Sequence, residues 1–200
     1  MLENENTEHS SICSFYSFEN NLKIREKIFS FEKRISRKTT IIANLLKDIC
    51  EEGKTNTEEK LILIKPFISK KIPQISINDY IERLLKYSKV SEEIFILVLI
   101  YIDRLNKIYN INLNYNNIHK LILVSFVVTI KFHEDEHYSL KFYAKLGGIS
   151  IKEMINLEYA FLKLLDFKLY IAEELYQKYN NYLLSLENIE DDNDDDDFSD

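Results

Sequence analysis

Apolar positions recur at helical spacing through the second half of the chain, separated by short polar stretches. Residues 77–87 place their apolar side chains at three- and four-residue steps, which predicts an amphipathic helix with one buried face. Residues 94–109 and 116–133 are apolar on nearly every side around their middles, so each needs neighbours on most sides. The pattern therefore predicts a small helical bundle around a buried central helix.

Two further helices follow from the signals that start and stop them. A short helix over residues 139–146 is ended by Gly147-Gly148, a common C-terminal signal. Ser150 and Glu153 form a capping box that opens the next helix, and a final amphipathic stretch covers residues 172–184. No alternating strand pattern stands out in this half, which favours an all-α fold.

Composition sets the organisation that we expect. The chain has 200 residues, of which 46% are hydrophobic, with only 3 Gly and 2 Pro, as suits one helical domain with appendages. We expect a disordered N-terminus over 1–17, a helical extension over 18–72, a main domain over 73–186 and a disordered acidic tail over 187–200. The tail holds nine acids and no base, so the remainder, with 26 bases against 24 acids, is nearly neutral.

These features exclude several classes of protein. Cys13 and Cys50 lie far apart, which indicates neither a disulfide framework nor a cysteine zinc site. No signal peptide is visible, and the longest apolar runs, 94–102 and 121–130, fall short of the roughly 20 residues that span a bilayer. We expect no membrane association and a cytoplasmic or nuclear location. Basic side chains along residues 18–50 raise nucleic-acid binding as an alternative, which the nearly neutral body disfavours.

The segment from His133 to His137, HEDEH, matches the H-E-x-x-H pattern that holds zinc in many metalloproteases. Glu158 even lies at a downstream distance suited to a third ligand. A metal-binding helix needs an apolar face on which to pack, however, and Asp135 and Glu136 leave this segment without one. We therefore interpret HEDEH as the end of a helix and the loop that follows, and we predict no metal site.

Four segments carry a resemblance to a known family: ISINDYIERLLKY, YIDRL, IHKLILVSFVVTIKFHED and FYAKLGGISIKEMINLEYAFLKLLDFKL, at residues 75–87, 101–105, 118–135 and 142–169. In this order and spacing they resemble a cyclin box, specifically that of the single-box P/U-type cyclins related to the yeast phosphate-system cyclin. The loop segment HEDEHYSLK departs from the asparagine-rich form usual in the family. The resemblance implies an all-α cyclin-box bundle of about five helices around a buried central helix, over residues 73–186, with an extra N-terminal helix.

The resemblance also implies a function. Cyclins are not enzymes and use no cofactor; they bind a cyclin-dependent protein kinase and press its C-helix inward, which brings the kinase's own Lys-Glu ion pair into place. Lys131 and Glu158 match the two charged residues that fix this contact in the family. Four apolar positions match those that line the kinase contact, although helical spacing suits them equally to the core: Val128, Phe132, Leu162 and Phe167.

Asp103 is expected to be structural. It follows a buried apolar run and needs a partner, for which we expect an ion pair with Arg83 or another base of residues 77–87. The hydrophobic substrate-docking motif of mitotic cyclins is not recognisable in residues 77–87. We expect a kinase regulator of this kind to be monomeric apart from its kinase. The alternative function is that of a cyclin-fold adaptor, which acts in transcription or nucleic-acid-associated complexes without a kinase.

Overall fold

The computed structural model describes residues 37–52 and 62–194, with side chains as far as Asn188. Two compact units divide the chain, Met1–Arg37 and Lys38–Asp200, and the account below concerns the second. The predicted disordered N-terminus over 1–17 and the basic stretch as far as residue 36 lie outside the described residues.

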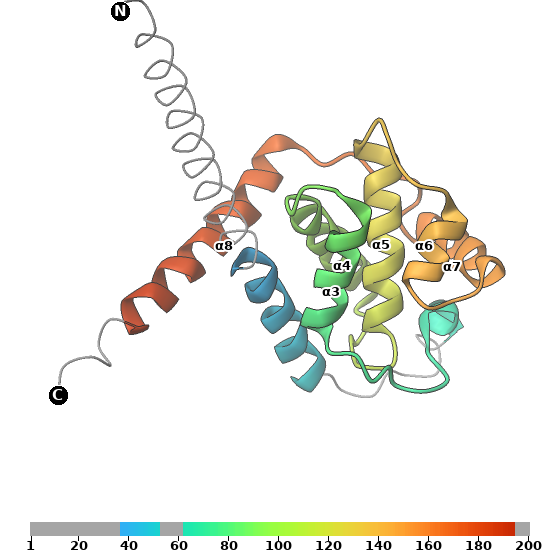
Figure 1. The fold of residues 1–200 in the computed structure, drawn as a ribbon, viewed down its shortest axis with the longest axis horizontal. Coiled ribbons are helices and arrows are strands. Elements are labelled where there is room, and N and C mark those ends of the chain that lie inside the picture. Colours follow the sequence, from blue (N-terminus) through green and yellow to red (C-terminus); the bar gives the residue numbers. More distant parts are fainter. Residues whose placement is uncertain (1–36, 53–61, 195–200) are drawn as a thin grey trace, which may run out of the picture. The chain divides into compact units, whose positions relative to one another are not determined.

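The described residues contain helices and no strand, which confirms the predicted all-α fold. A helix over residues 37–52 and a short turn over 62–64 come first. The elements that follow are η1 (Lys65–Phe67), α3 (Ile77–Ser88), α4 (Ile94–Tyr109), α5 (Ile118–His133), α6 (Leu140–Leu146), α7 (Ile151–Leu164) and α8 (Glu173–Asp194). α5 runs between α3 and α4 on one side and α6 and α7 on the other (Figure 1). None of the described helices is both long and apolar enough to cross a membrane.

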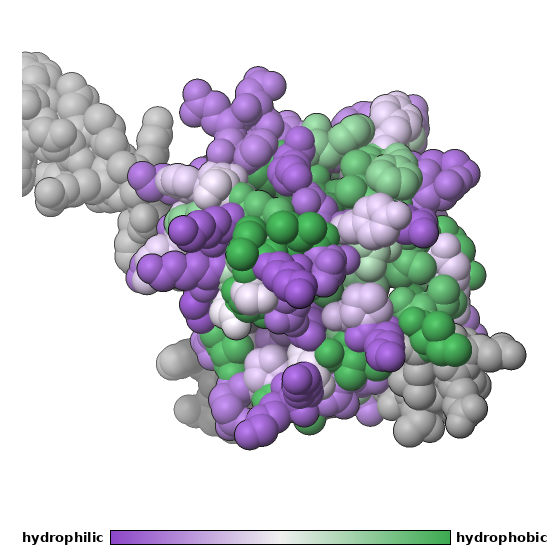
Figure 2. Space-filling model, turned by 90° about the vertical axis from the view of Figure 1, so that its right-hand side faces the viewer, coloured by the Kyte–Doolittle hydropathy of each residue, from purple (hydrophilic) through white to green (hydrophobic). Residues whose placement is uncertain are grey.

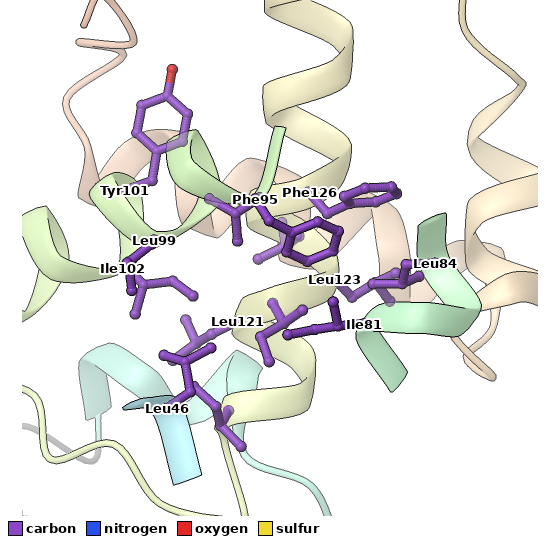
Figure 3. Close-up of a cluster of buried hydrophobic side chains, with 14 of the residues drawn as sticks. Leu46, Ile81, Leu84, Phe95, Leu99, Tyr101, Ile102, Leu121, Leu123 and Phe126 are labelled. Carbon is purple, nitrogen blue, oxygen red and sulfur yellow. The ribbon is translucent and has the colours of Figure 1, made fainter. Parts of the chain in front are cut away.

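Buried side chains surround α5 because its sequence is apolar around the whole helix. Phe126 stacks on Phe95 of α4 with ring centroids 5.2 Å apart, and Leu46 approaches from the helix over residues 37–52 (Figure 3). Each fully buried side chain of this kind contributes about 1.5–3 kcal/mol relative to its exposed state. Inside the helix, the hydroxyl of Thr129 donates to the carbonyl of Ser125 at 2.7 Å, so this buried polar group is satisfied. The predicted buried central helix is confirmed.

The core begins earlier in the chain than predicted. Ile42 and Leu46, and then Ile64 and Phe67, are buried in the same hydrophobic cluster as α5. The compact unit accordingly starts at Lys38, well before the predicted boundary at residue 73. The physical reason is that α4 and α5 are apolar on most sides, so they need more cover than the later helices alone supply.

α8 continues past the predicted start of the acidic tail. The segment expected to be disordered, 187–200, is helical as far as Asp194, and its last six residues lie outside the described part of the chain. Leu183 is buried in the core and Tyr179 bonds to a side chain of α4. The acidic turns thus extend a helix that is already anchored, and extending a helix costs less than starting one.

Serine side chains start three of the helices. Ser76, Ser139 and Ser150 each accept a hydrogen bond from the amide three residues further on, at 3.0, 3.3 and 3.1 Å. The carboxylate of Glu153, rather than closing the predicted capping box, pairs with Lys120 of α5 at 2.8 Å. One side chain therefore caps the start of α7, and another ties its first turn to the central helix.

The double glycine after α6 meets two different requirements. A Cβ added to Gly147 would lie 2.2 Å from Cδ2 of Leu123 in α5, so a larger residue fits only if a buried leucine moves. Gly148 has open space around it but a φ of +73°, a conformation that residues with side chains rarely adopt. The two glycines thus allow the end of α6 to approach α5 closely and the chain to turn at once into α7.

Candidate functional site

The structure brings Lys131 and Glu158 together. Lys131 lies in the last turn of α5 and Glu158 in the middle of α7, with Nζ and Oε1 2.5 Å apart. The lysine side chain is 40% exposed and the glutamate side chain 15%. An ammonium group carries three donors and a carboxylate accepts several hydrogen bonds, so one mutual contact leaves both groups able to bind a partner.

Three of the four predicted apolar contact residues lie wholly or partly at the surface. Phe132 follows Lys131 and is half exposed, Leu162 lies one helical turn beyond Glu158 and is partly buried, and Phe167 is 62% exposed. Val128 differs, because it is 3% exposed and belongs to the core. The structure thus corrects the prediction for Val128, which belongs to the core and is not available for contact.

Sequence reasoning missed an exposed apolar stripe on α7. Ile151, Ile155 and Tyr159 lie four residues apart, so they share one side of the helix, and all three are exposed. The ammonium of Lys163 lies 5.4 Å from the ring centroid of Tyr159. On the face that carries α6 and α7, hydrophobic groups lie between charged ones (Figure 2). Exposed apolar side chains grouped in this way are typical of interaction surfaces.

The loop after α7 holds Phe167 in an uncommon conformation. Asp166 and Phe167 have φ angles of 52° and 54°, in the left-handed region that non-glycine residues seldom occupy. Such conformations persist where surrounding contacts impose them, and they gather at binding and catalytic sites. The Asp166 carboxylate also pairs with Lys168 at 2.8 Å.

Two side chains of α4 fix this loop. The guanidinium of Arg104 donates to the carbonyl oxygens of Lys168 at 2.5 Å and Tyr170 at 3.2 Å. The hydroxyl of Tyr101 donates to the carbonyl oxygen of Leu169 at 2.5 Å, and burial raises the pKa of this hydroxyl to about 12, so it stays protonated and able to donate. Three consecutive carbonyl groups are thereby bound to one helix, which gives the exposed aromatic ring before them a fixed support.

Asp103 has other partners than the predicted Arg83. Its carboxylate pairs with Lys107, one turn further along α4, at 2.5 Å, and it accepts a hydrogen bond from the hydroxyl of Tyr179 in α8. The predicted ion pair is therefore wrong. The i, i+4 spacing puts Lys107 beside Asp103 on the same helix, and the hydroxyl of Tyr179 is a second hydrogen-bond partner for the carboxylate. Arg83 instead lines a groove between α3 and α6.

HEDEH is the end of α5 and the start of a loop, as interpreted from the sequence. His133 is the last helical residue, and Glu134 has extended backbone angles, so the helix stops before His137. The His137 ring contacts the backbone of Tyr138, and the His133 ring lies 3.4 Å from the hydroxyl of Tyr101. Burial lowers the pKa of His133. Within the described ranges, no group of three or more His, Cys, Asp or Glu residues is arranged to hold a metal ion.

Comparison with known proteins decides the family. The family model described as Cyclin matches residues 3–169, most of the chain. This chain belongs to the cyclin family. Among its relatives, PHO85 cyclin-7 of Saccharomyces cerevisiae is 36% identical over 70% of this chain and 54% of its own length. PHO85 cyclin-like protein psl1 of Schizosaccharomyces pombe is 34% identical over 90% of this chain and 73% of its own. Cyclin-U4-1 of Arabidopsis thaliana is 32% identical over 74% of this chain and 75% of its own length.

These relatives confirm the resemblance to P/U-type cyclins. They also agree with the expectation that the chain is a regulatory protein and not an enzyme, since cyclins are regulatory subunits of kinases. The chain spans about half the length of the Saccharomyces cerevisiae relative.

Proposed function

We propose that this cyclin binds and activates a cyclin-dependent protein kinase through one contact surface, formed by α5, α7 and the loop after α7. The surface consists of the Lys131–Glu158 pair and the exposed apolar side chains beside it. Two of the relatives are named as PHO85 cyclins, which supports a kinase partner of that class. The observation that carries the proposal is the meeting, at 2.5 Å, of the two charged residues that the family resemblance singles out.

Activation follows from selective binding. A kinase phosphorylates its substrate only when its Lys-Glu ion pair and activation segment are in place, and the inward position of its C-helix allows both. A cyclin that binds the inward form more tightly shifts the kinase population toward it. Moving that equilibrium from 1:99 to 99:1 requires about a 10⁴-fold difference in affinity, or about 5.5 kcal/mol.

The contact surface has the chemistry to supply this difference. Phe132 and Phe167 are exposed aromatic rings, the kind of side chain that dominates the energy of protein interfaces. Glu158 is mostly shielded from water, and hydrogen bonds to a charged, shielded acceptor are roughly twice as strong as neutral ones. The ion pair also fixes both charged side chains before the kinase arrives, which reduces the entropy lost on binding.

Reconstitution tests the proposal. The purified chain is mixed with each cyclin-dependent kinase of the same organism, and complex formation and kinase activity are measured. One kinase should bind and become active, and Glu158→Lys should weaken binding by at least about 30-fold, the effect of losing a little over 2 kcal/mol from a charged interfacial contact. Glu174→Lys, the same charge change at an exposed position of α8, is the matched control and should bind normally.

Equal affinity of the wild type and Glu158→Lys would contradict this role of the glutamate. Binding to no kinase at all would contradict the proposal as a whole and favour the adaptor alternative, which salt-dependent binding to duplex DNA would then test.

A further inference from the structure

One side of α7 carries exposed apolar side chains along two full turns. Ile151, Ile155 and Tyr159 are 41%, 52% and 60% exposed, and each lies four residues after the one before. Met154 and Phe161 of the same helix are fully buried, so they mark the side that packs on the core. We call the three exposed residues the α7 stripe. An apolar surface of this length is typical of a site where another molecule packs.

The sequence of α7 is symmetrical in character about Ile155. Four residues before and after it stand the apolar residues Ile151 and Tyr159. Three residues before and after it stand a base, Lys152, and an acid, Glu158. In two antiparallel copies of α7 that meet at this isoleucine, each residue lies level with the one that is equally far from it in the opposite direction. A second copy of the same helix would therefore meet an apolar residue with an apolar residue and a base with an acid.

The charges of α7 select this antiparallel arrangement. Lys152 of one copy lies level with Glu158 of the other, about 4.5 Å along the helix from the central isoleucine, and the two-fold symmetry repeats the pair at the other end. Lys152 is exposed, and Lys131 occupies only Oε1 of Glu158, so the carboxylate can accept a further hydrogen bond. A parallel arrangement would instead set base against base and acid against acid.

The size of the α7 stripe indicates how strong such an association is. From Ile151 to Tyr159 the helix rises about 12 Å, so the contact involves little more than two turns of each copy. Interfaces that bury less than about 1,200 Å² belong mostly to weak and transient complexes. The ammonium of Lys163, 5.4 Å from the ring centroid of Tyr159, holds that ring in place before association, which reduces the entropy lost.

We propose that a second copy of this chain binds the α7 stripe, in an antiparallel two-fold dimer centred on Ile155 with a Lys152–Glu158 pair at each end. The dimer is weak, so the monomer expected from the sequence describes the dilute protein. Because Glu158 also belongs to the contact surface proposed for the kinase, dimerisation and kinase binding exclude each other. This last consequence rests on the proposed function, whereas the dimer does not.

Sedimentation velocity of the full chain without a kinase tests the inference, at about 0.15 M salt and from about 1 to about 300 µM protein. The sedimentation coefficient should rise with concentration from that of a monomer to that of a dimer. Ile155→Asp places a carboxylate opposite its own copy and should weaken the dimer at least about 10-fold. Ile108→Asp, at an isoleucine of α4 that is 57% exposed, is the matched control and should dimerise normally.

Three results of this experiment would overturn the inference. The first is a monomer at every concentration, the second is a dimer that Ile155→Asp leaves intact, and the third is an equal loss in Ile155→Asp and Ile108→Asp. Circular dichroism checks the folding of each variant.

Exchange of the paired charges tests the antiparallel arrangement independently. Lys152→Glu sets acid against acid and Glu158→Lys sets base against base, so each variant alone should dimerise at least about 10-fold more weakly than the wild type. An equimolar mixture of the two has an acid–base pair at both ends and should dimerise again. Lys178→Glu, the same charge change at an exposed position of α8, should not rescue Glu158→Lys when mixed with it. No rescue by Lys152→Glu, or equal rescue by Lys178→Glu, would refute the pairing.

The kinase experiment remains separate from this one. Kinase binding is measured at about 0.1 µM, where the chain is monomeric, so a failure of either proposal leaves the other standing. At concentrations where the free chain is dimeric, an excess of kinase should give complexes that contain one cyclin each. A complex in which two cyclins stay joined through α7 would contradict the exclusion.

Discussion

Gly147→Ala should destabilise the protein through one close approach between α6 and α5. The backbone of Gly147, with φ −76° and ψ −6°, suits alanine, so the backbone itself adds no strain. The new Cβ would lie 2.2 Å from Cδ2 and 2.8 Å from Cδ1 of Leu123, whose side chain is fully buried. The leucine has no free space into which to turn, so either it leaves its rotamer or α6 moves away from α5.

The expected cost follows from that contact. Inserting a methyl group into a packed core costs about 1–3 kcal/mol, and alanine recovers about 0.5–1 kcal/mol of the chain entropy that glycine loses on folding. The free energy of unfolding should therefore fall by up to about 2.5 kcal/mol, which for a chain of this size lowers Tm by up to about 10 °C. Gly148→Ala is the matched control: nothing lies within 4 Å of its Cβ, and its cost of about 1–2 kcal/mol comes from the left-handed backbone.

Urea denaturation of the wild type and five variants tests the cause. Both glycine variants are measured in the wild-type chain and in Leu123→Ala, where the obstructing methyl groups are gone. Gly147→Ala should become neutral or stabilising in that background, while Gly148→Ala should cost the same in both. An equal cost of Gly147→Ala in the two backgrounds would refute the close-approach argument.

Three other predictions concern the half-buried Glu92, the loop after α7 and α8. Burial, with smaller contributions from neighbouring acids, raises the pKa of Glu92 from 4.5 to about 7, so the folded state keeps a proton that the unfolded state loses. Stability should therefore fall as the pH rises from about 5 to 8, and Glu92→Gln should remove much of this dependence in urea titrations; an unchanged pH slope would contradict it. Arg104→Gln should weaken kinase binding only while Phe167 is present, so a double-mutant cycle with Phe167→Ala should be non-additive, and additive losses would show that the arginine acts elsewhere. Tyr179→Phe removes the donor to Asp103 and should lower the free energy of unfolding by about 1 kcal/mol in the same urea assay; equal stability would mean that the bond contributes nothing.

The elements that the sequence predicts well are those whose pattern has one physical solution. A helix as apolar as α5 can only be central, and a glycine pair can only end α6. Where an apolar residue could be either buried or exposed, the sequence pattern does not decide between the two. Ile155 is as apolar as Met154, yet one is exposed and the other buried, because the position of neighbouring helices decides.

The side-chain contacts that sequence reasoning missed also depend on how distant segments of the chain pack together. Asp103 bonds to Tyr179, which lies 76 residues further along the chain, and no local rule selects that tyrosine. The groove between α3 and α6 likewise exists only because two helices with an intervening stretch of more than 50 residues lie side by side. Charge alone also misjudged the end of α8, since a helix anchored by its earlier turns can extend into a run of acidic residues that would not form a helix alone.

The burial of α5 also constrains how the protein is made. A chain emerging from the ribosome exposes this apolar helix until α7, which ends about 30 residues later, has appeared, a delay of a few seconds at 5–20 residues per second. During that time the helix is a natural target for chaperones and for aggregation. A gene truncated before or within α7 would therefore give an aggregation-prone product, not a smaller working cyclin.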